Sequence, residues 1–289
     1  MNTESLKTFV ALARSGNFTK TAQSLYVAQS TVSGRIKELE SQLGKPLFFR
    51  GKQDVTLTPA GKEFLTYANQ IMELEDNAIS AVNMIGQFSD SLHIAVPHNL
   101  FDCHVNRLVE QFMRMNPDIA VRVSIAHSEE IISHMTISNY DIAFLYSTFH
   151  NPNYIRKPFI SDQIVLATSS VNTEYCTGIA STQIAELPFV YSQIWELNYN
   201  WILPEHRVYA LNINVVSKMI SYVKASNWYC FFPKKIIEKD LHEGSLIEIP
   251  FLDIDLPTKP SFMVYSNSYE KNDALVKLID LIEQDYVQA

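Results

Sequence analysis

The feature that most constrains how this chain can fold is a pair of short helices joined by a tight turn near its N-terminus. Thr19 is a good N-cap for the first of them. After a brief turn over residues 26–28, the second helix runs to about Leu43 and is ended by Gly44. Its apolar residues recur at spacings of four, three and four: Val32, Ile36, Leu39 and Leu43. Two such helices, the second longer and polar outward, predict a helix-turn-helix.

Another helix precedes this pair and completes a mainly helical head. Its apolar residues fall at i, i+3, i+4 and i+7, which is one helix face: Leu6, Phe9, Val10 and Ala13. Gly16 then supplies a helix stop.

The outward face of the longer helix holds groups suited to nucleic acid. One stripe and the positions beside it comprise Gln29, Ser33, Lys37, Ser30 and Gly34. An amide, hydroxyls and a cation can read base edges or bind phosphates. Arg35 lies nearer the flank and suits a phosphate. An ordinary solvated helix face is the alternative on composition alone.

The next segment is typical of a β-hairpin. Residues 47–50 and 55–57 predict two strands, and residues 51–54 predict the turn between them. A basic hairpin directly after a helix-turn-helix is a wing, which lies along the minor groove or the DNA backbone. Arg50 and Lys52 then stand where phosphates would lie. The alternative is two exposed charges on a hairpin.

The charge of the chain is divided unevenly. The 289 residues have a formal net charge of −8, yet residues 1–65 hold nine Lys and Arg against five Asp and Glu. A basic head on an acidic body indicates an anionic partner for the head alone. A chance scatter of surface charge is the alternative.

Length and composition exclude several classes of protein. At roughly 150 residues per domain the length predicts two domains, and a hydrophobic content of 47% excludes general disorder. Because no run of 18 apolar residues exists, we expect no transmembrane helix and no membrane partner. The start of the chain lacks the pattern of a signal peptide. Three widely spaced cysteines fit a reducing cytoplasm, where we place the protein.

A long amphipathic helix follows the hairpin. Thr58 and Pro59 are a cap followed by a proline at the first helical position, a strong start signal. The apolar stripe comprises Tyr67, Ile71, Leu74, Ala78, Val82 and Ile85. A helix of about 28 residues cannot bury this stripe inside a small winged domain, so we expect an antiparallel or coiled-coil-like dimer contact. Packing on its own body is the alternative.

From residue 90 onward, predicted strands alternate with predicted helices. Strands are expected over residues 92–97, 119–125, 141–146, 164–167, 189–191, 208–213 and 228–232. Helices are expected around residues 108–115, 129–135 and 274–286. This alternation predicts an α/β fold with largely parallel strand pairing.

Motifs for catalysis and for cofactors are missing from the sequence. There is no GxGxxG, P-loop, HExxH or CxxC motif, and the eight His show no metal-ligand spacing. We therefore expect no enzyme activity, no metal and no cofactor. A thiol redox sensor stays open as an alternative, although Cys176 and Cys230 form no close sensing pair.

A run of residues in the head matches a known family without gaps. These are Phe9, Phe18, Thr19, Ala22, Leu25, Gln29, Ser30, Thr31, Val32, Ser33, Ile36, Leu39, Glu40, Leu43, Gly44, Leu47, Phe48, Arg50, Leu57, Thr58 and Gly61. At these spacings the head resembles the DNA-binding domain of LysR-type transcriptional regulators. The resemblance implies that Gln29, Ser30, Ser33 and the position of Gly34 lie at the major groove. The expected DNA-binding residues are Thr19, Lys20, Gln29, Ser30, Thr31, Ser33, Gly34, Arg35, Lys37, Arg50 and Lys52.

Two residues depart from the family pattern. The family usually has Ser at the position of Ala28, where it caps the recognition helix. Either Ser30 takes over that cap, or the cap is lost, which would cost about 1 kcal/mol of stability. The family also usually has a basic or amide residue where Gly34 stands. We therefore expect an operator preference shifted from the family norm, with Arg35 or Lys37 compensating.

The remainder resembles the family's effector domain, two α/β lobes like a periplasmic binding protein. The expected organisation is a winged head over 1–58, a linker and dimerisation helix over 59–89, and an effector domain over 90–289. Lobe one would be 90–161 with 267–289, and lobe two 162–266. The chain would cross between lobes near Ser161-Asp162 and near Ser266-Asn267.

Ligands in such folds bind between the lobes, at strand ends and helix N-termini. The candidates by position are His98, Asn99, Leu100, His127, Ser128, Ser192, Gln193, Trp195 and Ser217. Plain loop or core is the alternative for each. Family members often bind a carboxylate with Ser or Thr after the first strand. Residues 98–100 include neither, so the sequence gives less support for a small anionic effector. Tyr191 and Trp195 would tolerate an aromatic or apolar effector.

These observations predict a bacterial LysR-type regulator. Its expected partners are double-stranded operator DNA with an interrupted palindrome, a second copy of the chain through the linker helix, and a small-molecule effector. Two dimers would assemble into a tetramer, and RNA polymerase is a partner if the protein activates. The rival is a small-molecule sensor that acts mainly through protein contacts.

Overall fold

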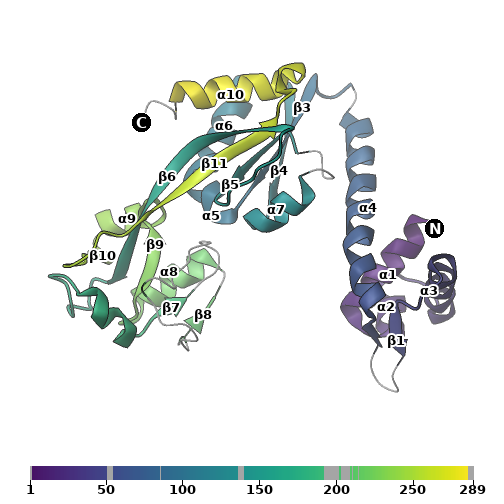
Figure 1. The fold of residues 1–289 in the computed structure, drawn as a ribbon, viewed down its shortest axis with the longest axis horizontal. Helices are drawn as coiled ribbons and strands as arrows, with labels where there is room; N and C mark the ends of the chain where they lie inside the picture. The colour runs from purple at the N-terminus through teal and green to yellow at the C-terminus, as the bar shows by residue number, and fades with distance from the viewer. Residues whose placement is uncertain are drawn as a thin grey trace. The chain divides into compact units, whose positions relative to one another are not determined.

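The computed structural model describes residues 2–50, 55–84, 86–135, 140–191, 202, 209, 211–213 and 215–285. The described chain forms two compact units, one holding residues 1–87 and the other the described residues from Phe88 onward (Figure 1). Each unit has its own hydrophobic core.

The N-terminal unit is a winged helix-turn-helix with a long helix attached. Its elements are α1 Thr3–Ser15, α2 Phe18–Ser24, α3 Gln29–Leu43, β1 Phe48–Arg50, β2 Val55–Leu57 and α4 Pro59–Met84. Strands β1 and β2 pair antiparallel, with Phe48 opposite Leu57. The core comprises Leu6, Phe9, Val10, Leu12, Ile36, Leu39, Leu47, Phe48 and Ala68. The predicted helices and hairpin strands are thus confirmed, although Leu43 is 40% exposed rather than buried.

The caps of these helices correct one prediction. Asn17, not Thr19, is the N-cap of α2, because its Oδ1 accepts hydrogen bonds from the backbone N–H groups of Thr19 and Lys20 at 2.9 and 3.0 Å. Helix α2 begins one residue before Thr19, which puts Thr19 at the second helical position. Gly16 and Gly44 end α1 and α3 in the left-handed conformation, as predicted.

Hydrogen bonds and one close backbone approach fix the hairpin against its neighbours. Glu40 Oε1 accepts the backbone N–H of Leu47 at 2.8 Å, which ties α3 to β1. Thr58 Oγ1 accepts the N–H of Gly61 at 2.9 Å and donates to the carbonyl of Pro46 at 2.8 Å, so the predicted cap of α4 is confirmed. A Cβ on Gly61 would overlap the carbonyl oxygen of Leu47, so only glycine fits there.

The second unit is built around one seven-stranded sheet. Its strand order is β10-β6-β11-β5-β3-β4, with β9 paired to β6. The strands are β3 Asp90–Val96, β4 Ile119–Ile125, β5 Ile142–Leu145, β6 Tyr154–Ser169, β9 Cys230–Pro233, β10 Leu246–Ile249 and β11 Thr258–Ser266. A separate pair is β7 Val190–Tyr191 with β8 Leu211–Asn212. The main helices are α5 His98–Leu100, η1 Phe101–Val105, α6 Asn106–Met115, α7 Ser128–His134, α8 Val216–Lys224, η4 Lys234–Ile237, α9 Glu238–His242 and α10 Asp273–Asp285.

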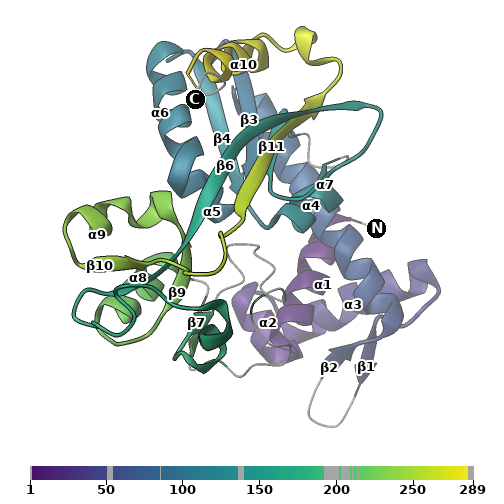
Figure 2. The ribbon, with the colours of Figure 1, turned by 60° about the vertical axis from the view of Figure 1, so that its left-hand side comes forward.

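The pairing pattern corrects the expectation of a largely parallel sheet. Among the described pairs of strands, only β3 with β4, β3 with β5, and β7 with β8 are parallel. The long strands β6 and β11 lie side by side and antiparallel (Figure 2). They also pair antiparallel with β10, β9 and β5.

Strands β6 and β11 connect the two lobes. Their register places one of the two points where the chain crosses between the lobes at a different residue from the one predicted. Residues 262–265 of β11 pair with β5, and Met263 and Tyr265 belong to the core of lobe one. Lys259 pairs with Asp162, so the return crossing lies near Pro260 rather than at Ser266-Asn267. The sequence missed it because lobe membership depends on strand register, which local periodicity does not define.

Each lobe has its own core. Lobe one packs α6 and α10 on β3 and β5, through Phe112, Leu278, Ile94 and Phe144 among others. Lobe two has a cluster on each face of β6 and β9. Val165 and Phe232 pack toward α8, whereas Leu166 and Phe231 pack toward Ile184 and Phe189. This alternation is the period-two pattern of a strand buried on both faces.

Candidate nucleic-acid interface and effector site

Helix α3 presents one buried and one solvated face. Val32, Ile36 and Leu39 are at most 1% exposed and hold the helix against the core of the head. On the other side Gln29, Ser30, Thr31, Gly34 and Lys37 are exposed, and Ser33 is half-buried. An amide, hydroxyls and an ammonium group therefore project from one helix face, as a reading helix requires.

The N-terminus of α3 has no side-chain cap. Ala28 is the N-cap residue and makes no side-chain hydrogen bond, so Ser30 does not replace the missing cap. The sequence left two alternatives open, and the structure agrees with the one in which the cap of α3 is lost.

Gly34 leaves an empty position on the outward face. A Cβ built there meets no heavy atom within 4 Å. Packing therefore does not require glycine at this position.

Arg35 is engaged inside the head. Its Nη1 donates to Thr8 Oγ1 at 3.1 Å, and its Nη2 lies 3.1 Å from Glu4 Oε2. Only 25% of the Arg35 side chain is exposed. The flank position was recognised from the sequence, but the partners on α1 were not, since helical periodicity does not show which helix a flank meets.

The remaining expected DNA contacts do not belong to α3. Thr19 and Lys20 are exposed in the first turn of α2. Arg50 ends β1 opposite Val55. Lys52 lies outside the described residues. Phe49, which the sequence did not single out, is 58% exposed on β1.

Helix α4 has one side on the head and an apolar row in solvent. Ala68 is fully buried in the core of the head, and Lys7 lies 3.6 Å from Glu75. The exposed row comprises Tyr67 (53%), Ile71 (37%), Leu74 (48%), Ile79 (53%) and Val82 (66%). Ile85 lies outside the described residues. An exposed apolar row of this length is typical of an interaction surface.

The candidates after β3 have three different environments. His98 is exposed, and its Nδ1 lies 3.1 Å from Asp102 Oδ2. Leu100 is fully buried in the core of lobe one, which favours the core alternative. Asn99 is 1% exposed; its Nδ2 donates to Tyr146 Oη at 2.9 Å, while its Oδ1 has no hydrogen-bond partner.

Asn99 belongs to a buried polar network where the chain crosses between lobes. Tyr146 Oη donates to Asp162 Oδ2 at 3.2 Å, and His104 Nε2 lies 2.6 Å from Asp162 Oδ1. Ser128 Oγ accepts the backbone N–H of Tyr146 at 3.1 Å, which joins a second predicted residue to the network. Lys259 Nζ lies 5.0 Å from the centre of the Tyr146 ring. The network thus combines residues from the ends of β3 and β5 with the crossing strands.

The sequence did not single out Tyr146 or Lys259, and it named Asp162 only as a crossing point. His104 was not put forward as a site residue either. It lies on η1, a π-helix, which turns it toward Asp162. π-helical turns occur often at functional sites, but no sequence pattern marks them.

The other candidates are either exposed or outside the described residues. His127 is exposed, and Ser217 is exposed on α8. Ser192, Gln193 and Trp195 lie outside the described residues. Tyr191 stacks on Tyr209, with ring centres 4.5 Å apart.

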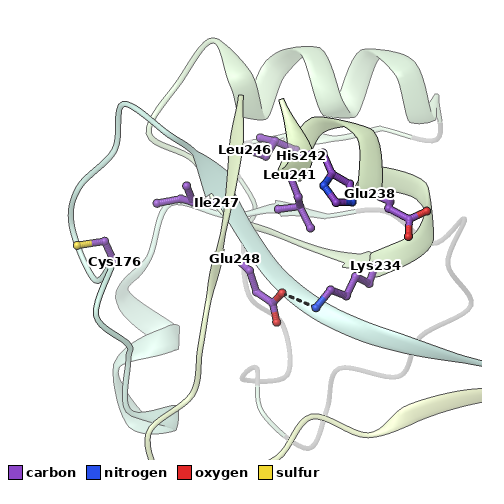
Figure 3. A pocket seen from close by; sticks show the side chains of 8 residues that line it. All are labelled: Cys176, Lys234, Glu238, Leu241, His242, Leu246, Ile247 and Glu248. Atoms are coloured by element: carbon purple, nitrogen blue, oxygen red, sulfur yellow. Dashed lines mark ion pairs between the residues drawn. The ribbon is translucent and has the colours of Figure 1, made fainter. Parts of the chain in front are cut away.

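A surface pocket of about 580 Å³ lies elsewhere in lobe two (Figure 3). Its wall includes Leu241, Leu246 and Ile247, and Lys234 is paired with Glu248 across it at 2.9 Å. None of the effector candidates within the described part of the chain lines it.

The three cysteines have different environments. Burial, reinforced by the nearby Asp162 carboxylate, raises the pKa of the Cys103 thiol far above its usual range. Cys176 is exposed and Cys230 is buried. Among the described residues, no three His, Cys, Asp or Glu side chains are placed to hold a metal ion. No described helix is long and apolar enough to cross a membrane.

Comparison with known proteins identifies both units. Residues 3–62 match the bacterial regulatory helix-turn-helix proteins of the lysR family, and residues 86–286 match the LysR substrate binding domain. The chain is 26% identical over 280 residues to the uncharacterized HTH-type transcriptional regulator YusT of Bacillus subtilis, covering 93% of this chain and 91% of YusT. It is 24% identical over 277 residues to the HTH-type transcriptional regulator CitR of the same organism, covering 92% of this chain and 94% of CitR.

Solved structures share the fold. CbnR in complex with its target DNA superposes with a TM-score of 0.70 at 16% identity, covering 98% of this chain and 99% of that one. Full-length BenM superposes with a TM-score of 0.52 at 20% identity, covering 98% of this chain and 97% of that one.

Proposed function

This chain belongs to the LysR family of DNA-binding transcriptional regulators, and we propose that it reads an interrupted palindromic operator through the outward face of α3. The exposed Gln29, Ser30 and Lys37 carry the proposal, because they face solvent while the opposite face of the same helix is buried. Ser33 reads beside them, and Thr31 lies next to the groove wall. Thr19, Lys20, Arg50 and Lys52 bind phosphates.

Arg35 is left out of the reading set. Its guanidinium group already has Thr8 and Glu4 as partners, and a DNA contact would require it to leave them. Lys37 is the exposed cation of α3 on the reading face, so it compensates for the absent side chain at Gly34.

A second copy of the chain covers the exposed row of α4. Pairing two such helices removes Tyr67, Leu74 and Val82 from water and sets two reading helices at a fixed separation. Two dimers then assemble through the effector domains into a tetramer. The proposed division is a head over 1–58, a linker helix over 59–89 and an effector domain over 90–289.

A small molecule bound between the lobes controls the spacing of the heads. The buried network of Asn99, Tyr146, Asp162 and His104 supports this position, because it joins strand ends of lobe one to a strand that crosses into lobe two. A ligand with different affinities for two lobe arrangements shifts their populations, and with them the geometry of the dimer on DNA.

The proposal assigns no enzymatic activity and no cofactor to the chain. It places the protein in the cytoplasm with the chromosome, and RNA polymerase is its partner at promoters that it activates. Redox sensing by Cys103 is disfavoured, because burial raises the thiol pKa and thiolate is the reactive form.

Selection from genomic DNA tests the proposal. The purified protein is incubated with sheared genomic DNA of its source at moderate salt, and the retained fragments are sequenced. We expect a few fragments that share an interrupted inverted repeat, with retention falling steeply as salt increases. Equal retention of all fragments, or none even after Ala28→Ser and Gly34→Arg, would contradict it.

A further inference from the structure

Tyr26 has an unusual backbone conformation and an exposed side chain. It lies in the turn between α2 and α3 with φ of 55°, the left-handed region. Its own N–H bonds to the carbonyl of Gln23 at 3.2 Å, and the next N–H bonds to the carbonyl of Ala22 at 3.0 Å. The residue is 96% exposed. The turn therefore holds a phenol ring out in water.

A second tyrosine has the same backbone conformation, but its side chain is packed against a core. Among the described residues other than glycine, only Tyr26 and Tyr175 have positive φ, the latter at 59°. Tyr175 packs its side chain against the core of lobe two, so burial offsets its unfavourable backbone. Left-handed backbone is unfavourable for a bulky side chain, and Asn or Gly normally takes such a position. Tyr26 has the same strain without the burial.

The position of Tyr26 indicates what it meets. It lies three residues before Gln29, the first residue of α3, and the first turn of α3 is exposed. In a helix-turn-helix the N-terminal residues of the second helix contact base edges, while the first helix crosses the DNA backbone. The turn that connects the two helices therefore lies near the sugar-phosphate backbone, to which tyrosine hydroxyls can donate hydrogen bonds.

We propose that the hydroxyl of Tyr26 donates a hydrogen bond to a backbone phosphate at the edge of the operator's major groove. Strained residues that persist without local compensation are often kept for function. The inference rests on the proposed function, because it takes α3 as the reading helix. A phosphate contact fixes the orientation of α3 and is indifferent to base sequence.

Two substitutions test the contact by fluorescence anisotropy, on the operator recovered by genomic selection and on a scrambled duplex of equal length. Tyr26→Phe keeps the ring and removes only the hydroxyl. We expect its dissociation constant to rise about tenfold or more on both duplexes, as for loss of one hydrogen bond to a charged group. The dependence on salt should not change, because a neutral hydroxyl releases no counterion.

Tyr26→Asn separates strain from binding. Because Asn tolerates the left-handed conformation, we expect an unchanged or higher urea midpoint together with weaker binding to both duplexes. Tyr175→Phe is the matched control and should leave both dissociation constants unchanged. The inference is overturned if Tyr26→Phe binds both duplexes within twofold of the unmodified protein. Failure of the proposed function is seen separately, since the unmodified protein would then not distinguish operator from scrambled DNA.

Discussion

The guanidinium group of Arg35 on α3 lies 3.1 Å from the carboxylate of Glu4 on α1. The same group donates to Thr8, which is fully buried. Arg35 therefore joins two helices of the head, and its neighbour Gly34 adds no side chain to the outward face of α3. In the reading role that we propose for α3, sequence recognition falls to a small set of neutral groups and to Lys37.

Arg35→Ala should destabilise the head more than it alters sequence preference. We expect a loss of about 1–2 kcal/mol in the free energy of unfolding, because the buried Thr8 hydroxyl keeps its bond to the Glu4 carbonyl but loses the charged donor that it accepts from. Urea unfolding of Arg35→Ala, Glu4→Ala and the double variant measures the coupling. Since Glu4 is 61% exposed, that coupling should stay below about 1 kcal/mol. Full stability with a changed operator motif would contradict a structural role for Arg35.

Gly34 should accept a side chain without strain. Gly34→Ala is expected to stabilise the protein by about 1 kcal/mol, since alanine is the better helix former and nothing lies within 4 Å of the new Cβ. Gly34→Arg adds a side chain to the reading face and should change the motif selected from random duplexes. An unchanged motif with Gly34→Arg would show that this position does not meet the bases.

Asn17 and Thr19 form a matched pair for separating stability from binding. Asn17→Ala removes the cap of α2 and should lower the free energy of unfolding by about 1 kcal/mol. Thr19→Ala should change it by less than about 0.5 kcal/mol, as at most exposed sites, yet weaken binding to operator and scrambled DNA alike. Equal destabilisation by the two variants in urea would argue against Asn17 as the cap.

The exposed row of α4 should control self-association. Leu74 is 48% exposed in that row, and Leu74→Glu places a charge where the second helix packs. Sedimentation equilibrium should then show dimer dissociation at least tenfold easier. Asn69→Glu adds the same charge at an exposed position on another side of α4 and is the control. A dimer unaffected by Leu74→Glu would place the interface elsewhere.

Local patterns predicted the elements of this protein well. Helices α1, α3 and α4 and both strands of the wing follow from apolar spacing, glycine stops and a Thr-Pro start, all of which act within a few residues. The solvated face of α3 followed from the same spacing.

Long-range relationships escaped the sequence. The antiparallel pairing of β6 with β11 joins residues about a hundred positions apart, and its register decides which lobe Met263 belongs to. Likewise, the meeting of His104 with Asp162 depends on a π-helix and a distant strand. Neither has a local signature, because each is decided by the packing of whole elements.

The most direct test of the central claim compares operator with scrambled duplex for the unmodified protein and for a variant with both Gln29→Ala and Ser33→Ala. A reading role for α3 predicts that the unmodified protein prefers its operator by about a thousandfold or more. The double variant should lose at least about tenfold of that preference, because base-edge hydrogen bonds are removed. Gln42→Ala, an exposed change at the far end of α3, should retain it. An unchanged preference in the double variant would contradict the claim that the outward face of α3 reads the DNA.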